Sequence, residues 1–316
     1  MPQTASKNSE LVLGVDGGGT KTIAGLAAKD DADELLGRGT AGPSNPRAVG
    51  FEKAQANIDA AIDAAFAAAQ LPRTAVAAAC LALAGAGRPA EQEKMVSWAS
   101  NRRIAEKVRV TTDAEPILAA ASAENSGVAL ICGTGSLAWG RNKAGAVARA
   151  GGWGYLLGDE GGAYWLSLSG LRAALRAHDG RDRTTALLPG FLERLHLAEP
   201  RDLVDWVHDA ATTPSQIASL APTVFDLAAT DEVAANIIDT GAMSLADIIA
   251  AVAQRLGFSP VSYPLALAGS VLLNQPTYRD QALAYLADRN LHPATVTIIE
   301  EPVRGAVAIA RKMCLN

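Results

Sequence analysis

Two short apolar runs joined by three consecutive glycines lie near the start of this chain, and they constrain its fold most strongly. The runs cover 11–15 and 22–27, and the segment between them reads Asp-Gly-Gly-Gly-Thr-Lys. Apolar runs separated by a glycine turn predict a β-hairpin. Glycine accepts positive φ and has no side chain, so successive N–H groups of such a turn can point at one anion. We therefore predict a hairpin that holds phosphate, with Asp16 near a Mg²⁺ ion.

Two better-known glycine loops fit this stretch less well. A P-loop requires G-x-x-x-x-G-K-[ST], whereas Thr20 and Lys21 follow Gly19 in the reverse order. A dinucleotide fingerprint requires G-x-G-x-x-G at the start of a helix, and residues 23–25 (Ile-Ala-Gly) suit a strand. The remaining alternative is a plain glycine turn. The acid at position 16, with hydroxyl residues close by, favours a phosphate and Mg²⁺ site.

Length and charge favour a two-domain enzyme. With 316 residues, the chain exceeds the size at which one core usually stops growing. The net charge of −5 and the lack of a basic stripe argue against nucleic acid as a partner. The polar start of the chain predicts no signal peptide, and we expect no membrane span and a cytoplasmic location. Three scattered cysteines, Cys80, Cys132 and Cys314, do not predict a disulfide framework or a zinc site.

Beyond the hairpin, apolar periodicity and glycine or proline breaks predict alternating helices and strands. The segment 37–45 (GRGTAGPSN) is predicted as a loop because of its glycine, proline and serine content. Apolar residues at helical spacing from Phe51 to Ala69 predict an amphipathic helix that covers a sheet. The next predicted elements are strand 76–83, helix 89–101 and strand 107–112, with Asp113 at the end of the last strand.

The pattern of the first hairpin then returns. An apolar run at 128–132 leads into Gly133-Thr134-Gly135-Ser136, and 137–140 resumes as a strand. The sequence LALAG at 81–85 recurs at 265–269, and Val110-Thr111 recurs at nearly the same offset as Val296-Thr297. Two matches at almost one offset indicate an internal duplication. We therefore predict two α/β domains across a cleft, with both hairpin turns holding one polyphosphate.

Four segments in this order carry a family resemblance: DGGGTKT at 16–22, CGTGS at 132–136, GGWGYLLGDEGGAYW at 151–165 and LAGSV at 267–271. They resemble the actin-like ATPase superfamily and, within it, the BadF/BadG/BcrA/BcrD-type family that includes N-acetylglucosamine kinases. The resemblance covers nearly the whole chain. It implies an α/β fold of two actin-like, ribonuclease H-like ATPase domains facing across a cleft. It also implies ATP- and Mg²⁺-dependent phosphorylation of the 6-hydroxyl of N-acetylglucosamine.

The domain boundaries follow from the duplicated pattern together with this resemblance. The N-terminal domain is expected at 1–118, with a C-terminal helix at about 302–316 that packs back on it. The C-terminal domain is expected at 119–301, with a helical insertion at about 164–254. Whether the chain forms a homodimer is left open. The expected partner is a small-molecule amino sugar, with neither nucleic acid nor a membrane involved.

The resemblance also implies roles for single residues. Asp16 matches the Mg²⁺-associated acid, and Asp113 matches the catalytic aspartate. ATP is expected at two phosphate motifs and an adenosine motif: Gly17, Gly18, Gly19, Thr20, Lys21, Gly133, Thr134, Gly135, Gly269 and Ser270. The sugar is expected at a second set: Asn45, Asp113, Gly152, Trp153, Gly154 and Asp159.

Chemistry gives an independent reason for the role of Asp113. Phosphoryl transfer depends mainly on positioning and charge neutralisation, and the acceptor hydroxyl needs a carboxylate that orients it and takes its proton. An aspartate at the end of a strand suits this task. The alternative is that Asp113 caps the following helix, for which aspartate is also favoured.

Three rival functions stay open at this point. Glucosamine and N-acetylmuramic acid are alternative substrates, although GGWG and GDEG around the sugar loop favour the acetylated sugar. In a different class, the same superfamily branch contains ATP-driven activators of acyl-CoA dehydratases and benzoyl-CoA reductase, which share an iron–sulfur cluster across a dimer. Such a cluster needs cysteine thiolates. Cys80 falls inside a predicted buried strand and Cys132 precedes the second glycine turn, so a paired cluster site is hard to build.

Overall fold

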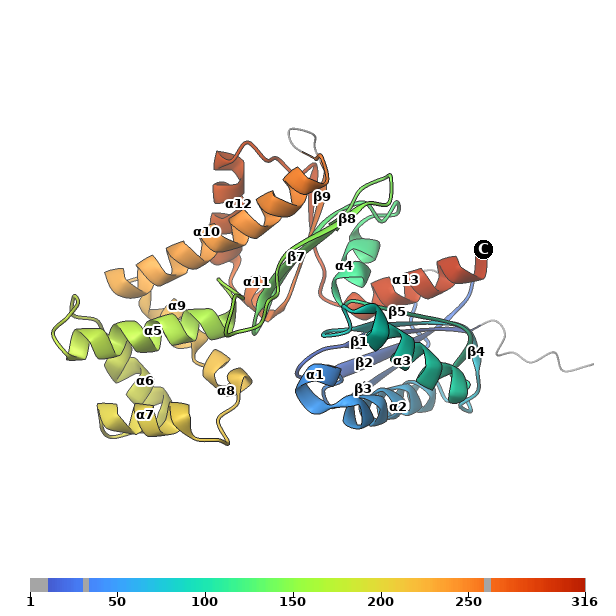
Figure 1. Cartoon of the computed structure of the whole chain (residues 1–316), viewed down its shortest axis with the longest axis horizontal. Helices are drawn as coiled ribbons and strands as arrows, with labels where there is room; N and C mark the ends of the chain where they lie inside the picture. Colours follow the sequence, from blue (N-terminus) through green and yellow to red (C-terminus); the bar gives the residue numbers. More distant parts are fainter. Residues whose placement is uncertain (1–10, 31–33, 259–262, 316) are drawn as a thin grey trace, which may run out of the picture. The chain divides into compact units, whose positions relative to one another are not determined.

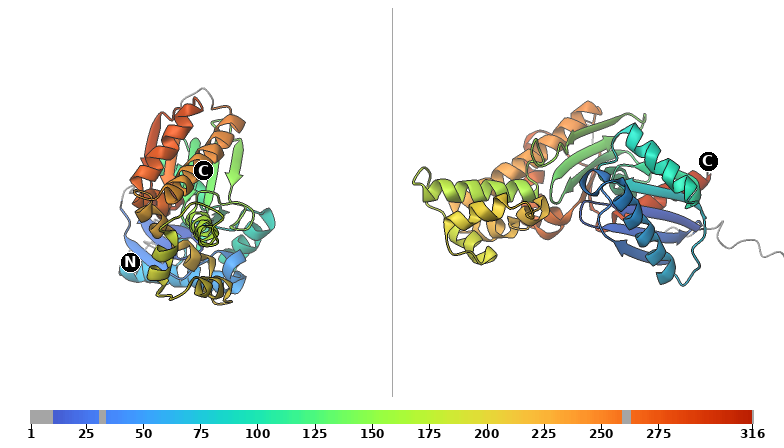
Figure 2. Two further views of the ribbon diagram at one scale, coloured as in Figure 1. Left: turned by 90° about the vertical axis from the view of Figure 1, so that its left-hand side faces the viewer. Right: turned by 60° about the horizontal axis from the view of Figure 1, so that its bottom comes forward.

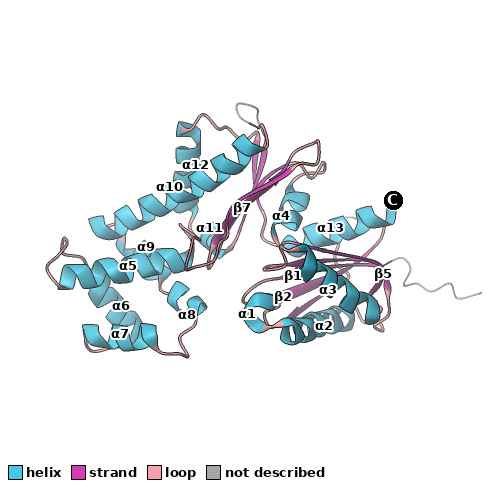
Figure 3. Ribbon diagram, in the orientation of Figure 1, coloured by secondary structure: helices cyan, strands magenta, loops and turns pink. Residues whose placement is uncertain are grey.

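The computed structural model describes residues 11–30, 34–258 and 263–315 (Figure 1). The chain divides into two compact units. Unit 1 comprises the residues up to Ser126 together with Ile299 onward, and unit 2 comprises Gly127–Ile298. Each unit is built around a five-stranded sheet flanked by helices (Figure 3).

The sheet of unit 1 has the strand order β3-β2-β1-β4-β5. A hairpin forms its first part, because β1 (Leu11–Gly17) and β2 (Thr22–Ala28) pair antiparallel, and β3 (Gly37–Ala41) adds to β2. The strands β1, β4 (Val76–Leu83) and β5 (Ala105–Thr111) run parallel. Their carboxyl ends therefore lie at one edge of the sheet, where ligands bind in open α/β sheets.

Side-chain alternation along β1 explains how helices cover both faces of this sheet. Leu11, Leu13 and Val15 pack in one apolar cluster with α2 (Phe51–Ala68) and α3 (Pro89–Asn101). Val12 joins a second cluster with α13 (Pro302–Leu315) on the opposite face. The short helices α1 (Pro46–Val49) and α4 (Ala114–Ala121) complete unit 1, and α4 packs against α13 (Figure 1).

The prediction of a loop at 37–45 was wrong for its first half. Residues 37–41 form the edge strand β3, which lies on α2. A Cβ atom at Gly37 would overlap the carbonyl oxygen of Ala65, and one at Gly39 would overlap that of Ala61. The glycines are present because the backbone of α2 approaches the strand closely. A strand of this kind has the same glycine-rich composition as a loop, so composition alone does not distinguish the two.

The sheet of unit 2 repeats the topology of the first. Its order is β10-β9-β6-β7-β8, in which the hairpin of β6 (Gly127–Cys132) and β7 (Ser136–Arg141) occupies the place of β1 and β2. The outer strand β8 (Val147–Gly151) pairs antiparallel with β7, whereas β9 (Pro264–Ala268) and β10 (Thr295–Ile298) extend the sheet in parallel. The repeated LALAG sequences fall on β4 and β9, which are equivalent strands, so the predicted duplication is seen in the topology.

Helices fill the segment between β8 and β9. Five of them gather beyond the sheet of unit 2 (Figure 2), and the sixth, α10, packs against β6, β7 and β8. Their bounds are α5 (Ala163–His178), α6 (Leu187–Leu195), α7 (Pro200–His208), α8 (Pro214–Ala218), α9 (Ala221–Leu227) and α10 (Glu232–Arg255). Two further helices, α11 (Ser270–Asn274) and α12 (Pro276–Asp288), follow β9, and α12 packs on α10.

The helix α10 is, among the described helices, the one long and apolar enough to cross a membrane. Its apolar residues belong to the core of unit 2, where Leu245, Ile249 and Val252 are fully buried. A central core helix has this composition without a membrane. The length and hydropathy of α10 are therefore explained by the fold of unit 2.

Candidate active site

The glycine turn of unit 1 is a tight hairpin turn whose tip is exposed. Gly18 N–H donates to the Lys21 carbonyl at 2.9 Å, and the Gly18 carbonyl accepts from the N–H groups of Ser44 and Asn45. Gly19, Thr20 and Lys21 are exposed, so their backbone and side chains are accessible to a ligand. Positive φ, which we predicted as an option for this turn, is not used at Gly17, Gly18 or Gly19.

The reason for Gly17 is packing within unit 1. A Cβ atom at this position would overlap the Ser44 hydroxyl and lie 2.5 Å from the Leu83 side chain. Thr22 is also internal, because its hydroxyl donates to the Gly42 carbonyl at 2.6 Å and lies 2.8 Å from the Ser44 Oγ. Thr22 and Ser44 are both fully buried. Thr20 is therefore the accessible threonine of the turn, and Thr22 fastens the turn to the loop before α1.

Asn45, the predicted sugar asparagine, lies where three turns meet. It is the N-cap of α1, with its Oδ1 accepting from Arg47 N–H at 3.0 Å. Its side chain also lies so close to Gly85, in the turn after β4, that a Cβ atom there would overlap it. Gly85 has φ of +79°, which favours glycine independently. Asn45 is thus fixed beside the glycine turn by its backbone and beside Gly85 by its side chain.

Two acids lie at the carboxyl edge of the unit 1 sheet. Asp16 pairs in register with Ala82 of β4, and Ala82 pairs with Thr111 at the end of β5, two residues before Asp113. Burial, and then the negative charge of Asp113, raise the pKa of Asp16 to about 7, although Lys21 opposes the shift. The two carboxylates are therefore close enough to interact, and a cation bound near them would favour their ionised forms.

Asp113 occupies the N-cap position of α4, but its side chain makes no capping hydrogen bond. Its backbone is also helical, with φ of −62° and ψ of −18°, whereas a capping aspartate normally has extended backbone. The capping interpretation therefore does not account for this carboxylate.

Glu115, which the sequence did not single out, has the most enclosed carboxylate near Asp113. Its side chain is 4% exposed and accepts hydrogen bonds from Arg109, Thr111 and Asn125. By sequence alone, an acid in the first turn of a helix indicates only a favourable interaction with the helix dipole. Arg109 and Thr111 lie on β5 and Asn125 lies in the loop after α4, and the turn from strand to helix brings all three to Glu115.

The second glycine turn, in unit 2, is closed by its own backbone and by the start of α5. Gly133 N–H donates to the Gly135 carbonyl at 2.9 Å. The carbonyls of Gly133 and Thr134 accept from the first N–H groups of α5, those of Ala163 and Tyr164. This explains why GDEGGAYW follows GTGS in the sequence: the loop returns to fix the turn at the N-terminus of the helix.

Asp159, which we predicted on the sugar side, lies directly against this turn. A Cβ atom at Gly135 would overlap its carboxylate, and Gly154 N–H donates to its Oδ1 at 3.3 Å. Asp159 has φ of +62°, a conformation that costs a non-glycine residue about 1–3 kcal/mol and often marks a functional site. Burial and the charge of Glu160 raise its pKa, although hydrogen bonds from Gly154 and Ser136 oppose the shift. Asp159 thus joins the GTGS turn to the GWG turn.

The adenosine motif also lies beside the second turn. Gly269 has φ of +102°, and a Cβ atom there would overlap the backbone of Cys132 at the end of β6. A Cβ atom at Gly133 would be 3.8 Å from the Ser270 hydroxyl. Unit 2 therefore brings together Gly133, Thr134, Gly135, Asp159, Gly269 and Ser270, which are far apart in sequence.

The GGWG loop presents an unusually apolar surface. Trp153 is 71% exposed, and Leu156 and Leu157 are 79% and 81% exposed. Arg149 holds the loop: its guanidinium stacks on Trp153 at 5.4 Å and donates to the carbonyls of Gly151 and Gly152. A groove of about 620 Å³ lies beside Trp153, lined by Ala146, Val147, Ala148, Arg149, Arg255 and Leu256. Trp153 can therefore serve as an accessible apolar wall for a ligand.

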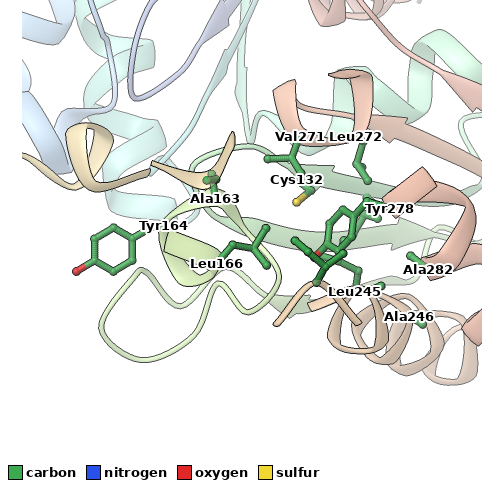
Figure 4. Close-up of a cluster of buried hydrophobic side chains, with 14 of the residues drawn as sticks. Cys132, Ala163, Tyr164, Leu166, Leu245, Ala246, Val271, Leu272, Tyr278 and Ala282 are labelled. Atoms are coloured by element: carbon green, nitrogen blue, oxygen red, sulfur yellow. The ribbon is translucent and has the colours of Figure 1, made fainter. Parts of the chain in front are cut away.

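Two of the three cysteines, Cys80 and Cys132, do not suit an iron–sulfur cluster. Cys80 and Cys132 belong to different units and are both fully buried. Burial raises the pKa of Cys80 to about 12 and raises that of Cys132 as well, whereas a cluster needs thiolates. Figure 4 shows Cys132 among Val271, Leu272 and Tyr278, and its thiol donates to the Gly161 carbonyl. Within the described residues, no group of three or more acids, histidines or cysteines could hold a metal.

Over almost its whole length the chain is similar to two proteins named as amino-sugar kinases. It is 31% identical to the N-acetylmuramic acid/N-acetylglucosamine kinase of Clostridium acetobutylicum, over 96% of this chain and 99% of that one. It is 30% identical to the N-acetyl-D-glucosamine kinase of Dictyostelium discoideum, over 96% and 98% of the two chains.

Solved structures show the same fold. A candidate N-acetylglucosamine kinase from Chromobacterium violaceum superposes with a TM-score of 0.74 at 24% identity, covering 98% of this chain and 100% of that one. Two five-stranded sheets of matching topology, each with a glycine turn, give this chain the actin-like ATPase fold that the sequence predicted. The model of the BadF/BadG/BcrA/BcrD ATPase family matches residues 13–310, and the chain therefore belongs to this family.

Proposed function

We propose that this chain is an ATP-dependent amino-sugar kinase that transfers the γ-phosphoryl group of ATP to the 6-hydroxyl of N-acetylglucosamine. The observation that carries the proposal is the carboxylate pair at the edge of the unit 1 sheet: Asp113 lies near Asp16 and makes no capping bond to its helix. Membership of an ATPase family and relatives that are amino-sugar kinases support the same reaction.

Asp113 has the role of general base in this proposal. The carboxylate accepts a hydrogen bond from the 6-hydroxyl and orients its oxygen. It takes the proton as the bond from that oxygen to the γ-phosphorus forms and the bond from the γ-phosphorus to the leaving ADP breaks. The exposed turn residues Gly19, Thr20 and Lys21, together with the half-buried Gly18, bind phosphate oxygens from unit 1. From unit 2, the turn Gly133–Gly135 binds phosphate, and Gly269 and Ser270 lie against the adenosine.

The residues present fit a Mg²⁺ ion. Magnesium is usually held through one or two carboxylates and substrate phosphates rather than by a full protein cage. Asp16 has a pKa raised to about 7 by burial and by Asp113, so a divalent cation would relieve an unfavourable charge at this edge. Asp16 would hold the ion directly or through water. When bound, the ion neutralises the charge on the transferred phosphoryl group.

The sugar contacts are proposed at Asn45 and Asp113 in unit 1, and at Gly152, Trp153, Gly154 and Asp159 in unit 2. Trp153 offers its exposed ring to the methyl of the acetamido group. A specific observation favours glucosamine as the second candidate, because the carboxylate of Asp159 near the same loop could pair with an ammonium group.

A coupled ADP-release assay tests the proposal. The sugars to compare are N-acetylglucosamine, glucosamine, N-acetylmuramic acid, N-acetylmannosamine and glucose, each with and without Mg²⁺. We expect the highest kcat/KM with N-acetylglucosamine and no turnover after Mg²⁺ is removed. ADP release that does not depend on any of these sugars would refute the kinase function.

A further inference from the structure

The carboxylate of Glu115 is buried in a polar cluster at the start of α4. Arg109 Nη2 lies 2.7 and 2.9 Å from its two oxygens, and Thr111 Oγ1 lies 2.5 Å from Oε2. The Asn125 amide donates to Oε1 at 3.4 Å. Glu115 is buried, and its guanidinium partner is 43% exposed. The carboxylate of Glu115 is therefore shielded from solvent in the first turn of the helix that begins just after Asp113.

The cluster closes the turn that carries Asp113. Arg109 and Thr111 are two residues apart on β5, so both side chains leave the same face of the strand. Glu115 lies in the first turn of α4. The hydrogen bond between Thr111 and Glu115 therefore joins the last residue of the strand to the helix across Asp113, which is two residues from each.

Stability alone gives a weak reason for such a cluster. Burying a charge costs free energy, and a buried ion pair contributes little more than apolar side chains of the same volume. Asn125 is itself poorly satisfied: its Oδ1 is buried and accepts no hydrogen bond within the described structure, and its φ is +50°. What the cluster does provide is a fixed direction for the strand-to-helix turn.

We infer that Glu115 is a positioning residue for phosphoryl transfer, which holds Asp113 in place through Thr111 and Arg109. This inference rests on the proposed function. Glu115 does not take the proton; it keeps the backbone of 111–115 in the one arrangement that aims the Asp113 carboxylate. A misplacement of about 1 Å at a reacting group can reduce the rate about a hundredfold, so a small loosening of this turn is enough.

Steady-state kinetics of Glu115→Gln with N-acetylglucosamine test the inference. Glutamine keeps the size of the side chain but weakens the bonds to Arg109 and Thr111. We expect kcat to fall about tenfold to a hundredfold while the KM for the sugar changes less than about threefold. Asp59→Asn is the matched control, because Asp59 in α2 pairs with Arg73 and Arg102 in the same unit. We expect it to lower the melting temperature without changing kcat.

Thr111 supplies a second variant that does not depend on how Glu115→Gln folds. Thr111→Val should lower kcat about as much as Glu115→Gln does. Thr111→Ser keeps the hydroxyl, so its kcat should stay close to that of wild type. Because both side chains act through one hydrogen bond, the double variant should lose less than the product of the single losses.

The outcomes separate this inference from the proposed function. If Asp113→Asn is inactive while Glu115→Gln and Thr111→Val keep wild-type kcat, the positioning role is wrong and the kinase function stands. Parallel changes in kcat for Asp59→Asn and Glu115→Gln would show a general loss of stability and would also overturn it. A wild-type protein that phosphorylates none of the sugars would refute both.

Discussion

At the scale of single residues, neighbouring positions of one motif have opposite roles. Thr20 and Thr22 both follow the three glycines, yet Thr20 is exposed and Thr22 is fully buried against Gly42 and Ser44. In the sequence both hydroxyl residues lie close to Asp16, and we assigned Thr20 to a phosphate contact. Hairpin register decides between them, because Thr22 pairs with Gly17 inside the ladder while Thr20 lies in the turn. Register depends on long-range pairing, which a local motif does not encode.

Asp113→Asn is expected to abolish turnover while the protein stays folded. The amide keeps the shape of the side chain but cannot take the proton, a loss of about 10² to 10⁴-fold in kcat. Sugar binding measured by calorimetry should be retained and the variant should stay folded, since asparagine keeps the shape of the side chain and no capping bond is lost. Near-normal turnover in this variant would remove Asp113 from the mechanism.

Asp16 makes the stability of the metal-free protein depend on pH. Its pKa rises from 3.8 to about 7 on folding, because of burial and then of Asp113. Between these two values the folded state binds a proton that the unfolded state has released, so stability falls as pH rises from about 4 to about 7. Asp16→Asn removes this loss. In urea titrations with EDTA, the variant should gain stability over wild type at pH 8 but not at pH 4; an equal gain at both values would contradict the assignment.

At the scale of elements, the strands were predicted well because apolar runs bounded by glycine carry most of the signal. The predicted strand at 76–83 and helix at 89–101 coincide with β4 and α3. The error at β3 arose where glycine serves helix packing rather than a turn. The short helices of unit 2 were grouped into one insertion, since helices of five to nine residues have too few turns to show clear periodicity.

The edge strand β3 gives a direct test of that packing. Gly39→Ala places a Cβ atom on the Ala61 carbonyl of α2, so we expect a loss of about 1–3 kcal/mol or more in the free energy of unfolding. Gly19→Ala is the matched control, because nothing lies within 4 Å of its Cβ position. Urea denaturation of both variants checks the prediction, and equal stabilities would show that the close approach of α2 is not limiting.

The start of α10 depends on one carboxylate that also fixes α6. Asp231 accepts four hydrogen bonds, from Thr185 Oγ1 and from the N–H groups of Ala186, Val233 and Ala234. Burial would raise its pKa, but these hydrogen bonds outweigh burial and lower it. Its contribution is therefore present above the unfolded pKa of about 3.9 and is lost as pH falls through the lower folded value.

Asp231→Ala should therefore destabilise the protein by about 2 kcal/mol or more at pH 7, because the cap and its neighbours lose their acceptor. Asp231→Asn, which can still accept from the helix N–H groups, should lose less. Denaturant titrations at pH 7 and at pH values below 4 measure the difference from wild type. A difference that does not shrink at the acid end would show that the charge of Asp231 is not involved.

At the scale of the whole molecule, the repeated topology explains why both glycine hairpins could be predicted from the sequence. Equivalent glycine turns follow β1 and β6. The sequence LALAG begins in both of the equivalent strands β4 and β9 and ends at a glycine just after each strand. Because the pattern occurs twice, a strand or turn predicted in one half is supported by its equivalent in the other half. The repeated sequence does not indicate Glu115 or Arg149. Their roles are seen only from their side-chain contacts.

Substrate choice tests the sugar contacts that we propose, Trp153 among them. If Trp153 holds the acetamido methyl and nearby groups satisfy the amide, glucosamine loses both contacts and brings an ammonium group into a site arranged for a neutral one. Lost apolar contact alone lowers kcat/KM by about 10 to 200-fold, whereas a lost hydrogen-bonding partner can lower it by about 10⁴ to 10⁵-fold.

We therefore expect a higher kcat/KM for N-acetylglucosamine than for glucosamine. Trp153→Ala should lower kcat/KM for N-acetylglucosamine and leave that for glucosamine unchanged, so the difference between the two sugars becomes smaller. Leu157→Ala is the matched control, since it removes a comparably exposed apolar side chain from the same loop. Asp159 is the residue that could reverse this result by pairing with the ammonium group. The contrary result would be that wild type phosphorylates glucosamine as well as N-acetylglucosamine and that Asp159→Asn loses the activity on glucosamine. It would identify a glucosamine kinase and reject the proposed contact between Trp153 and the acetamido methyl.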